Sequence, residues 1–281
     1  MQNKINNFIG IEYGRGCLRV ARDGGCADAP AAIRQIFPDA DWTMVTAAPF
    51  DADACVRDRF GENFEIQREI YRSTPNGRHI LIGGDHSVNF GHFAAMADMM
   101  PDDDLCLVYI DSHLDIHSVE TAVTQASGAP HGTNVRALLG NGDARWMGLC
   151  RKRPALKPEN LFFLGARSYE SAEIEFVQKN NIFMRSAEQI STDVGRNDAI
   201  RKIRERIAGR PFVLSFDFDV IDPALFRDVL VPAPNGIDVV TAEFFINEFR
   251  DAHAFEFVEY APAGDKNSAE IVRKLIGFLS S

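Results

Sequence analysis

The sequence contains no apolar stretch of the about 20 residues that a transmembrane helix requires. Its opening residues, MQNKINN, lack the apolar segment of a secretory signal peptide. A net charge of −10 leaves no excess of Lys and Arg for contact with nucleic acid or an anionic membrane surface. We therefore expect a cytoplasmic protein that binds no nucleic acid and no membrane.

Cysteine is also scarce. The five cysteines stand at positions 17, 26, 55, 106 and 150, and no two of them form a CxxC motif. An odd number of cysteines without a signal peptide argues against a disulfide framework and for a reducing compartment. We expect these thiols to be buried as small apolar side chains.

Short apolar runs alternate with helical patterns along the whole chain. Most runs contain no regularly spaced polar residues, which is typical of strands buried on both faces. The expected strands are 8–13, 42–47, 79–83, 105–111, 160–166, 181–184, 211–217 and 255–261. The expected helices are 29–37, 54–73, 89–100, 171–180, 197–208, 241–253 and 267–279, with loops at 118–133 and 222–238. This alternation predicts one α/β domain over residues 1–281, with a parallel sheet covered on both sides.

Ligands of an open parallel sheet bind beyond the carboxyl ends of its strands, and polar clusters follow four of the expected strands. The first is GGDHS (83–87), in which two glycines allow a sharp turn before His86. A histidine in a turn is most often unspecialised, so this motif carries little weight by itself.

The second cluster is DSHLD (111–115). In an extended chain Asp111, His113 and Asp115 would share one face, where the carboxylates would repel each other unless a cation lay between them. The third is SFDFDVIDP (215–223), in which Asp217 and Asp219 leave a core strand, a costly arrangement without compensation.

These clusters offer two imidazoles and four carboxylates as metal ligands: His86, Asp111, His113, Asp115, Asp217 and Asp219. Four carboxylates balance two divalent ions, and a bridging hydroxide would leave one negative charge that a small cationic substrate complements. Carboxylate-rich ligation without thiolate favours two Mn²⁺ over a structural Zn²⁺, although other divalent metals would fit. Two metals that share a water are suited to hydrolysis.

Two further residues have candidate catalytic roles. Glu259 ends the last expected strand and could face a substrate cation, although an ordinary surface position is an equally good interpretation of a single glutamate. His131 lies on the loop after the second cluster, and the ordinary pKa of histidine suits proton transfer. Simple exposure is the alternative for this histidine.

The three metal motifs, in this order, resemble those of the ureohydrolase family: arginases, agmatinases, guanidinobutyrases and formimidoylglutamases. The family patterns are G-G-D-H-S, D-A-H-x-D and S-x-D-x-D-x-x-D-P, and only Ser112 departs from them. ADAPAAIR (27–34) also resembles a family segment. The resemblance implies a three-layer α/β/α fold around an eight-stranded parallel sheet and a homo-oligomer, either a trimer or a hexamer.

The resemblance also implies the roles of individual residues. His86, Asp111, Asp115 and Asp219 would serve one Mn²⁺ or the bridge, and His113 and Asp217 would belong with the second ion. A metal-bridging hydroxide would attack the guanidino carbon, and Asp115 would pass a proton to the departing amine. His131 matches the family's proton-shuttle histidine, and Glu259 matches the glutamate that faces the guanidinium.

Substrate choice depends on the surrounding loops. Ser127, Glu170 and Glu173 match positions at which arginases hold the amino-acid end of the substrate, whereas His117 stands where arginases usually carry asparagine. The resemblance favours L-arginine or an arginine-like amino acid, giving urea and an amine. Agmatine, 4-guanidinobutyrate and formimidoylglutamate are the alternatives, although His131 counts against the last of these. A single-zinc deacetylase and a non-catalytic metal-binding relative are the alternatives from other classes.

Overall fold

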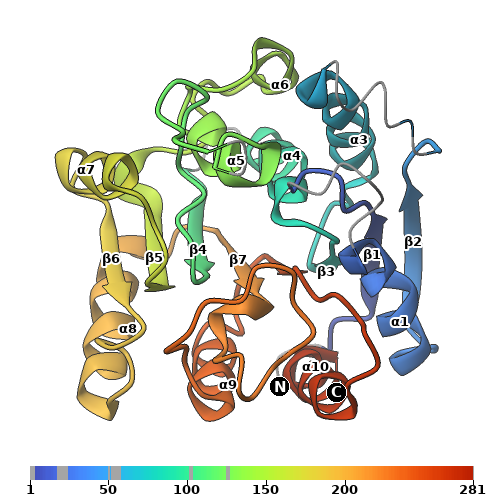
Figure 1. Ribbon diagram of the computed structural model, residues 1–281, viewed down its shortest axis with the longest axis vertical. Helices are drawn as coiled ribbons and strands as arrows, with labels where there is room; N and C mark the ends of the chain where they lie inside the picture. The colour runs from blue at the N-terminus through green and yellow to red at the C-terminus, as the bar shows by residue number, and fades with distance from the viewer. Residues whose placement is uncertain are drawn as a thin grey trace.

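Eight strands form one all-parallel sheet at the centre of the molecule (Figure 1). The computed structural model describes residues 4–17, 25–49, 51, 58–100, 104–124 and 127–280. The sheet has the order β2-β1-β3-β8-β7-β4-β5-β6. Its strands are β1 Asn7–Glu12, β2 Asp41–Thr46, β3 His79–Ile82, β4 Cys106–Ile110, β5 Leu161–Ala166, β6 Phe183–Ser186, β7 Phe212–Asp217 and β8 Ala254–Val258.

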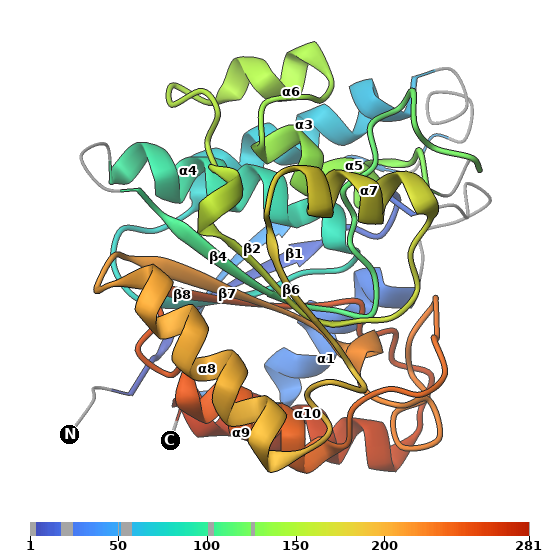
Figure 2. The same cartoon turned by 90° about the vertical axis from the view of Figure 1, so that its left-hand side faces the viewer.

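Helices cover both faces of this sheet, which gives the expected three-layer α/β/α fold (Figure 2). One layer contains α3 Arg59–Ser73, α4 Asn89–Met99, α5 Pro130–Leu138, α6 Ala144–Leu149 and α7 Ser171–Lys179. The other contains α1 Ala29–Ile36, α8 Asp193–Ile207, α9 Val239–Glu248 and α10 Lys266–Ser280. In the part of the chain that the structure describes, no helix is long and apolar enough to cross a membrane.

The continuous apolar runs follow from this double coverage. In β4, Cys106, Val108 and Ile110 belong to one core cluster, and Leu107 and Tyr109 belong to the cluster on the other face. Alternate side chains of a strand point to opposite faces, so a strand between two helical layers needs apolar residues at every position. The edge strand β2 instead alternates in burial, since only part of it is covered.

The expected elements are confirmed with shifted ends. The expected helix 54–73 is α3, which begins at Arg59, and residues 54–57 lie outside the described residues. The expected loop 118–133 was wrong at its end, because α5 begins at Pro130, where the first helical turn accepts proline. The short helix α6 was missed. Four of the cysteines are free and buried as expected, and Cys55 lies outside the described residues.

Candidate active site

The predicted metal ligands and Glu259 lie at the carboxyl ends of β3, β8, β7 and β4, which are four neighbouring strands in the middle of the sheet. His86 follows β3, Glu259 follows β8, and Asp217 ends β7. Asp111 and Asp115 follow β4. Residues separated by up to 173 positions in the sequence therefore meet at one place, where the backbone N–H of His86 donates to Glu259 Oε1 at 2.9 Å.

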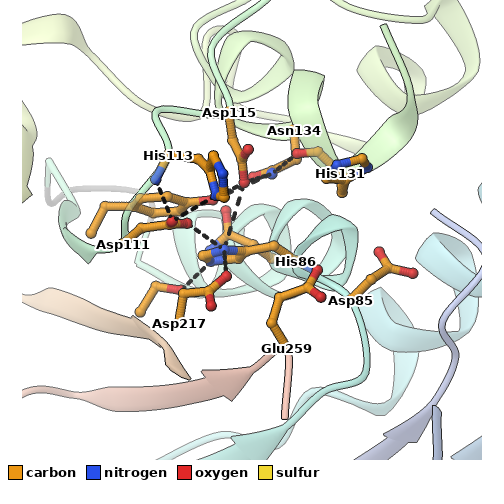
Figure 3. Close-up of polar contacts among 12 residues, drawn as sticks. Asp85, His86, Asp111, His113, Asp115, His131, Asn134, Asp217 and Glu259 are labelled. Atoms are coloured by element: carbon orange, nitrogen blue, oxygen red, sulfur yellow. Dashed lines mark hydrogen bonds and ion pairs between the residues drawn. The ribbon is translucent and has the colours of Figure 1, made fainter. Parts of the chain in front are cut away.

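The bend after β3 depends on Gly84. A Cβ atom at this position would lie 1.7 Å from the carbonyl oxygen of Tyr13, so no other residue fits without a backbone shift. Asp85 then accepts from the backbone N–H of Ser87, and the chain enters a short 3₁₀ turn, His86–Val88. This turn presents the imidazole of His86 to the carboxylates that follow β4 and β7 (Figure 3).

The first group of candidate metal ligands surrounds His86. Its Nδ1 lies 2.9 Å from Asp111 Oδ2, 3.1 Å from Asp217 Oδ2 and 3.6 Å from Asp115 Oδ2. Figure 3 shows these three carboxylates converging on the ring. His86, Asp111 and Asp115 each offer a ligand atom within a space that suits one metal ion.

The second group surrounds His113, whose Nδ1 lies 3.0 Å from Asp219 Oδ2 and 3.5 Å from Asp111 Oδ1. Asp111 thus presents one oxygen to each histidine, and Asp111, His113 and Asp219 form a second possible metal cluster. A shared carboxylate between two neighbouring clusters is the arrangement that a dinuclear centre requires.

The structure groups these side chains differently from the division that the family resemblance implied: Asp217 lies beside His86 and Asp219 beside His113. The expectation that Asp217 and Asp219 share one face of an extended chain was wrong, because β7 ends at Asp217 and Phe218–Val220 forms a 3₁₀ turn. Similarly, β4 ends at Ile110, and Asp115 has a left-handed backbone (φ 50°), so these side chains converge through turns rather than along strands.

The chemistry of these side chains fits bound cations. The four aspartates are at most 7% exposed, so their charges are poorly solvated. Burial, followed by the negative charge of Asp111, raises the pKa of Asp115 to about 7. Burial and the neighbouring carboxylates of Asp219 and Asp111 raise the pKa of Asp217 well above its ordinary value. Divalent cations among these carboxylates would compensate their charges.

A pocket of about 240 Å³ opens above the carboxylates. Among the predicted site residues, its walls include His113, Asp115, His117, Ser127, His131, Glu170, Glu173, Asp217, Asp219 and Glu259. His86 and Asp111 do not line it and are almost completely buried. Four of the six candidate metal ligands therefore share one cavity with the candidate substrate-binding residues.

His131 stands at the start of α5, and its Nδ1 lies 2.9 Å from the carbonyl oxygen of Gly16. A carbonyl only accepts, so Nδ1 carries the hydrogen and Nε2 is the basic nitrogen. Burial, with the neighbouring imidazoles of His113 and His86, lowers the pKa of His131 to about 4. Its imidazole is therefore neutral at neutral pH and can accept a proton.

Glu259 has a left-handed backbone (φ 63°) and is 4% exposed. Its backbone N–H donates to the carbonyl of Gly84 at 2.7 Å, so β8 and the turn after β3 fix each other. Within the described residues Glu259 Oε2 has no hydrogen-bond partner. A buried carboxylate oxygen on the wall of the pocket is available to a cationic donor.

At the outer part of the pocket His117 lies between two acids. Its Nε2 is 3.1 Å from Glu170 Oε2 and 3.3 Å from Glu173 Oε2. Both oxygens of Glu173 also accept backbone N–H groups, from Ile116 and Glu170, so this acid holds the start of α7. Burial alone would lower the pKa of His117, but Glu173 and Glu170 raise it.

Sequence reasoning missed the residues that support the candidate ligands. Tyr109 stacks on His86 with ring centroids 4.3 Å apart and donates to Asp115 Oδ2 at 2.8 Å. Ser215 Oγ lies 2.8 Å from His86 Nε2, and Asn134 donates to the carbonyl of His131. Tyr109 and Ser215 are polar residues inside otherwise apolar strands, and Ser215 also begins the family pattern S-x-D-x-D-x-x-D-P, so both carried a signal in the sequence.

This fold and site define a metal-dependent hydrolase that acts on C–N bonds of linear amidines. A family model described as the arginase family matches residues 7–277. The arginase of Entamoeba histolytica is 28% identical over 76% of this chain and 74% of its own length. A non-hepatic arginase of Xenopus laevis is 31% identical over 68% of this chain, but the match spans only 54% of that protein. The chain belongs to the arginase family.

The structural comparison agrees with this assignment of the fold. The crystal structure of the Entamoeba histolytica arginase in complex with L-ornithine superposes with a TM-score of 0.83 over 100% of both chains, at 23% identity. The described residues therefore have the fold of that enzyme.

Proposed function

We propose that this chain forms one catalytic domain that hydrolyses a guanidino substrate to urea and an amine, using two divalent cations, preferably manganese. The observation that carries the proposal is the pair of neighbouring clusters that share Asp111, together with a pocket lined by four of the six ligands and by Glu259, whose Oε2 has no hydrogen-bond partner among the described residues. Oxygen and imidazole ligands without thiolate suit Mn²⁺. The proposed ligands are His86, Asp111, His113, Asp115, Asp217 and Asp219.

When bound, such ions lower the pKa of water, supply a hydroxide nucleophile at neutral pH and stabilise developing negative charge. The residues of the chain orient the substrate and move protons. Glu259 Oε2 accepts hydrogen bonds from the guanidinium and holds its carbon over the metal centre. Asp115 would accept a proton from the attacking water and pass it to the departing amine, and His131 exchanges protons between the pocket and solvent through Nε2.

The far end of the substrate lies against Ser127, His117, Glu170 and Glu173. Glu170, 29% exposed at its side chain, is the acid that can receive the ammonium group of L-arginine, our first candidate. The contact of His117 with both acids favours a second candidate, 4-guanidinobutyrate, which has no ammonium group to replace the imidazole. A protonated His117 would then face the carboxylate of that substrate.

Urea release by the manganese-loaded protein tests the proposal, with L-arginine, agmatine, 4-guanidinobutyrate and free guanidine as substrates. Urea from L-arginine supports the ammonium contact with Glu170. Urea from 4-guanidinobutyrate alone supports the second candidate and assigns His117 to the carboxylate. No urea from any of these compounds, with metal bound, would contradict the proposed reaction.

If His131 transfers protons and binds no metal, its loss should lower the reaction rate without changing the amount of bound metal. His131→Ala should lower kcat about 100-fold, the usual effect of losing a proton-transfer group, while the bound metal stays at the wild-type amount. Steady-state kinetics and elemental analysis of the same sample measure the two effects. His113→Ala is the matched control and should lose metal as well as activity. A wild-type kcat in His131→Ala would remove this histidine from the mechanism.

A further inference from the structure

A chain of buried polar side chains runs along the α4 side of the sheet, away from the pocket. It begins with His79 at the start of β3 and continues through His92 of α4 and Glu256 of β8 to Ser215 of β7. All four residues are 0% exposed. Glu256 is the direct neighbour of Ser215 in the parallel register of β7 and β8. Polar groups buried so completely require defined hydrogen-bond partners.

The direction of the first hydrogen bonds follows from the carbonyl at one end. His79 Nδ1 lies 2.8 Å from the carbonyl oxygen of Gly77, so Nδ1 donates. Burial, with the charge of His92, lowers the pKa of His79 to about 4, which leaves the ring neutral and its Nε2 an acceptor. His92 Nε2, 2.6 Å away, must therefore donate to it.

A metal ion between the two rings would not fit this distance. Nitrogens bound to one ion at about 2.0–2.1 Å in tetrahedral geometry lie more than about 3 Å apart. The separation of 2.6 Å between the Nε2 atoms of His79 and His92 is that of a hydrogen bond. The two histidines therefore act on Glu256 rather than on a cation of their own.

His92 Nδ1 forms an ion pair and hydrogen bond with Glu256 Oε1. The other carboxylate oxygen, Oε2, accepts from the side-chain amide of Asn89 at 2.5 Å. Burial alone would raise the pKa of Glu256. The hydrogen bond and charge of His92 lower it, and so do hydrogen bonds from Ser215 and Asn89. Glu256 is thus an ionised carboxylate in the core, and a carboxylate can only accept.

The last steps connect this carboxylate to a candidate metal ligand. Ser215 and Glu256 are neighbours in the register of β7 and β8, and the Ser215 hydroxyl, which has one hydrogen to donate, is among the groups that lower the pKa of Glu256. The oxygen of this hydroxyl then accepts from His86 Nε2 at 2.8 Å. With the hydrogen on Nε2, a neutral His86 carries on Nδ1 the lone pair that a metal ion would bind, beside the carboxylates of Asp111 and Asp217. The neutral ring with Nδ1 unprotonated is the form that binds a metal ion.

We propose that Glu256, held ionised by His92 and His79, fixes His86 through Ser215 in the tautomer that binds the metal. Glu256, His92 and His79 are accordingly positioning residues for metal binding, although none touches the metal site itself. The inference rests on the proposed function, because it requires that His86 is a metal ligand. A buried ion pair costs stability, and this positioning role explains its presence in the core.

Titration calorimetry of the metal-free protein with Mn²⁺ alone tests the inference. Glu256→Gln removes the carboxylate charge and one of its two acceptor oxygens, so the Ser215 hydroxyl becomes able to donate to His86 Nε2, which moves the ring hydrogen to Nδ1. The expected result is a 10- to 100-fold rise in the Mn²⁺ Kd, the usual cost of losing such a supporting hydrogen bond. Thr74→Val, which removes a different buried hydroxyl bonded to the carbonyl of Ile70, is the matched control and should keep the wild-type Kd.

Ser215→Ala gives a second, independent test that leaves the ion pair of His92 and Glu256 intact. It should also weaken Mn²⁺ binding, and it decides the question if Glu256→Gln does not fold. Wild-type Kd values in folded Ser215→Ala or Glu256→Gln protein would overturn the inference and leave the proposed function standing. Failure of the wild-type protein to bind Mn²⁺ would overturn the proposed function itself, and the inference with it.

Discussion

Asp115→Asn is expected to lower kcat about 1,000-fold or more while the fold persists. The substitution removes the proton-transferring carboxyl group, and a general acid or base typically raises the rate of such a reaction by about 10²- to 10⁴-fold. Asparagine tolerates the left-handed backbone of residue 115 (φ 50°), so the turn is preserved. It can still accept from the Tyr109 hydroxyl, which donates to Asp115 Oδ2 in the wild type. Urea-release kinetics with manganese-loaded protein measure the effect.

The metal-free proteins supply the control for this variant. Burial and the charge of Asp111 disfavour an ionised Asp115, so a neutral amide relieves repulsion among the carboxylates. The Tm of metal-free Asp115→Asn should equal or exceed that of the metal-free wild type. A lower Tm in the variant would mean that its inactivity reflects a damaged fold, and an unchanged kcat would refute the role of Asp115.

Removal of the metal is expected to lower the stability of the wild type strongly. A ligand at 1,000 times its Kd stabilises the folded state by about 4 kcal/mol. For a chain of this size that corresponds to a Tm change on the order of 10 °C. The physical reason is the group of buried aspartates, whose mutual repulsion has no compensating charge once the cations leave. Differential scanning calorimetry with and without a chelator, followed by re-addition of Mn²⁺, measures the change.

Asp111→Asn provides the comparison, because this carboxylate faces both His86 and His113. Its loss should weaken both sites, so the Tm of this variant should respond little to Mn²⁺. His113→Ala removes a ligand of only one cluster and should keep part of the response. A wild-type Tm that is the same with and without Mn²⁺ would contradict the assignment of these residues as metal ligands.

The sheet was predictable from the sequence because it is covered on both sides. Runs such as HILI and CLVYI need apolar residues at every position, and such runs stand out in any sequence. The site motifs were equally visible, since each follows a buried strand directly. That β3, β8, β7 and β4 are neighbours could not be read from the residues alone, because the order of strands depends on packing over the whole domain.

Other features depend on local turns and on partners far along the chain. The 3₁₀ turn after β7 directs Asp217 towards His86 and Asp219 towards His113, and strand periodicity does not register a turn of three residues. The sequence predicted a loop as far as residue 133, although α5 begins at Pro130. A role for His79 and His92 could not be predicted from the sequence, because it depends on contact with Glu256, which is more than 160 positions away.

Anomalous diffraction at the manganese absorption edge, from crystals of the manganese-loaded protein, tests the central claim most directly. The account predicts two peaks at the carboxyl ends of the central strands. One should lie between His86, Asp111, Asp115 and Asp217, and the other between His113, Asp111 and Asp219. A single peak would contradict the dinuclear centre and favour a mononuclear hydrolase, and peaks away from these residues would contradict the site itself.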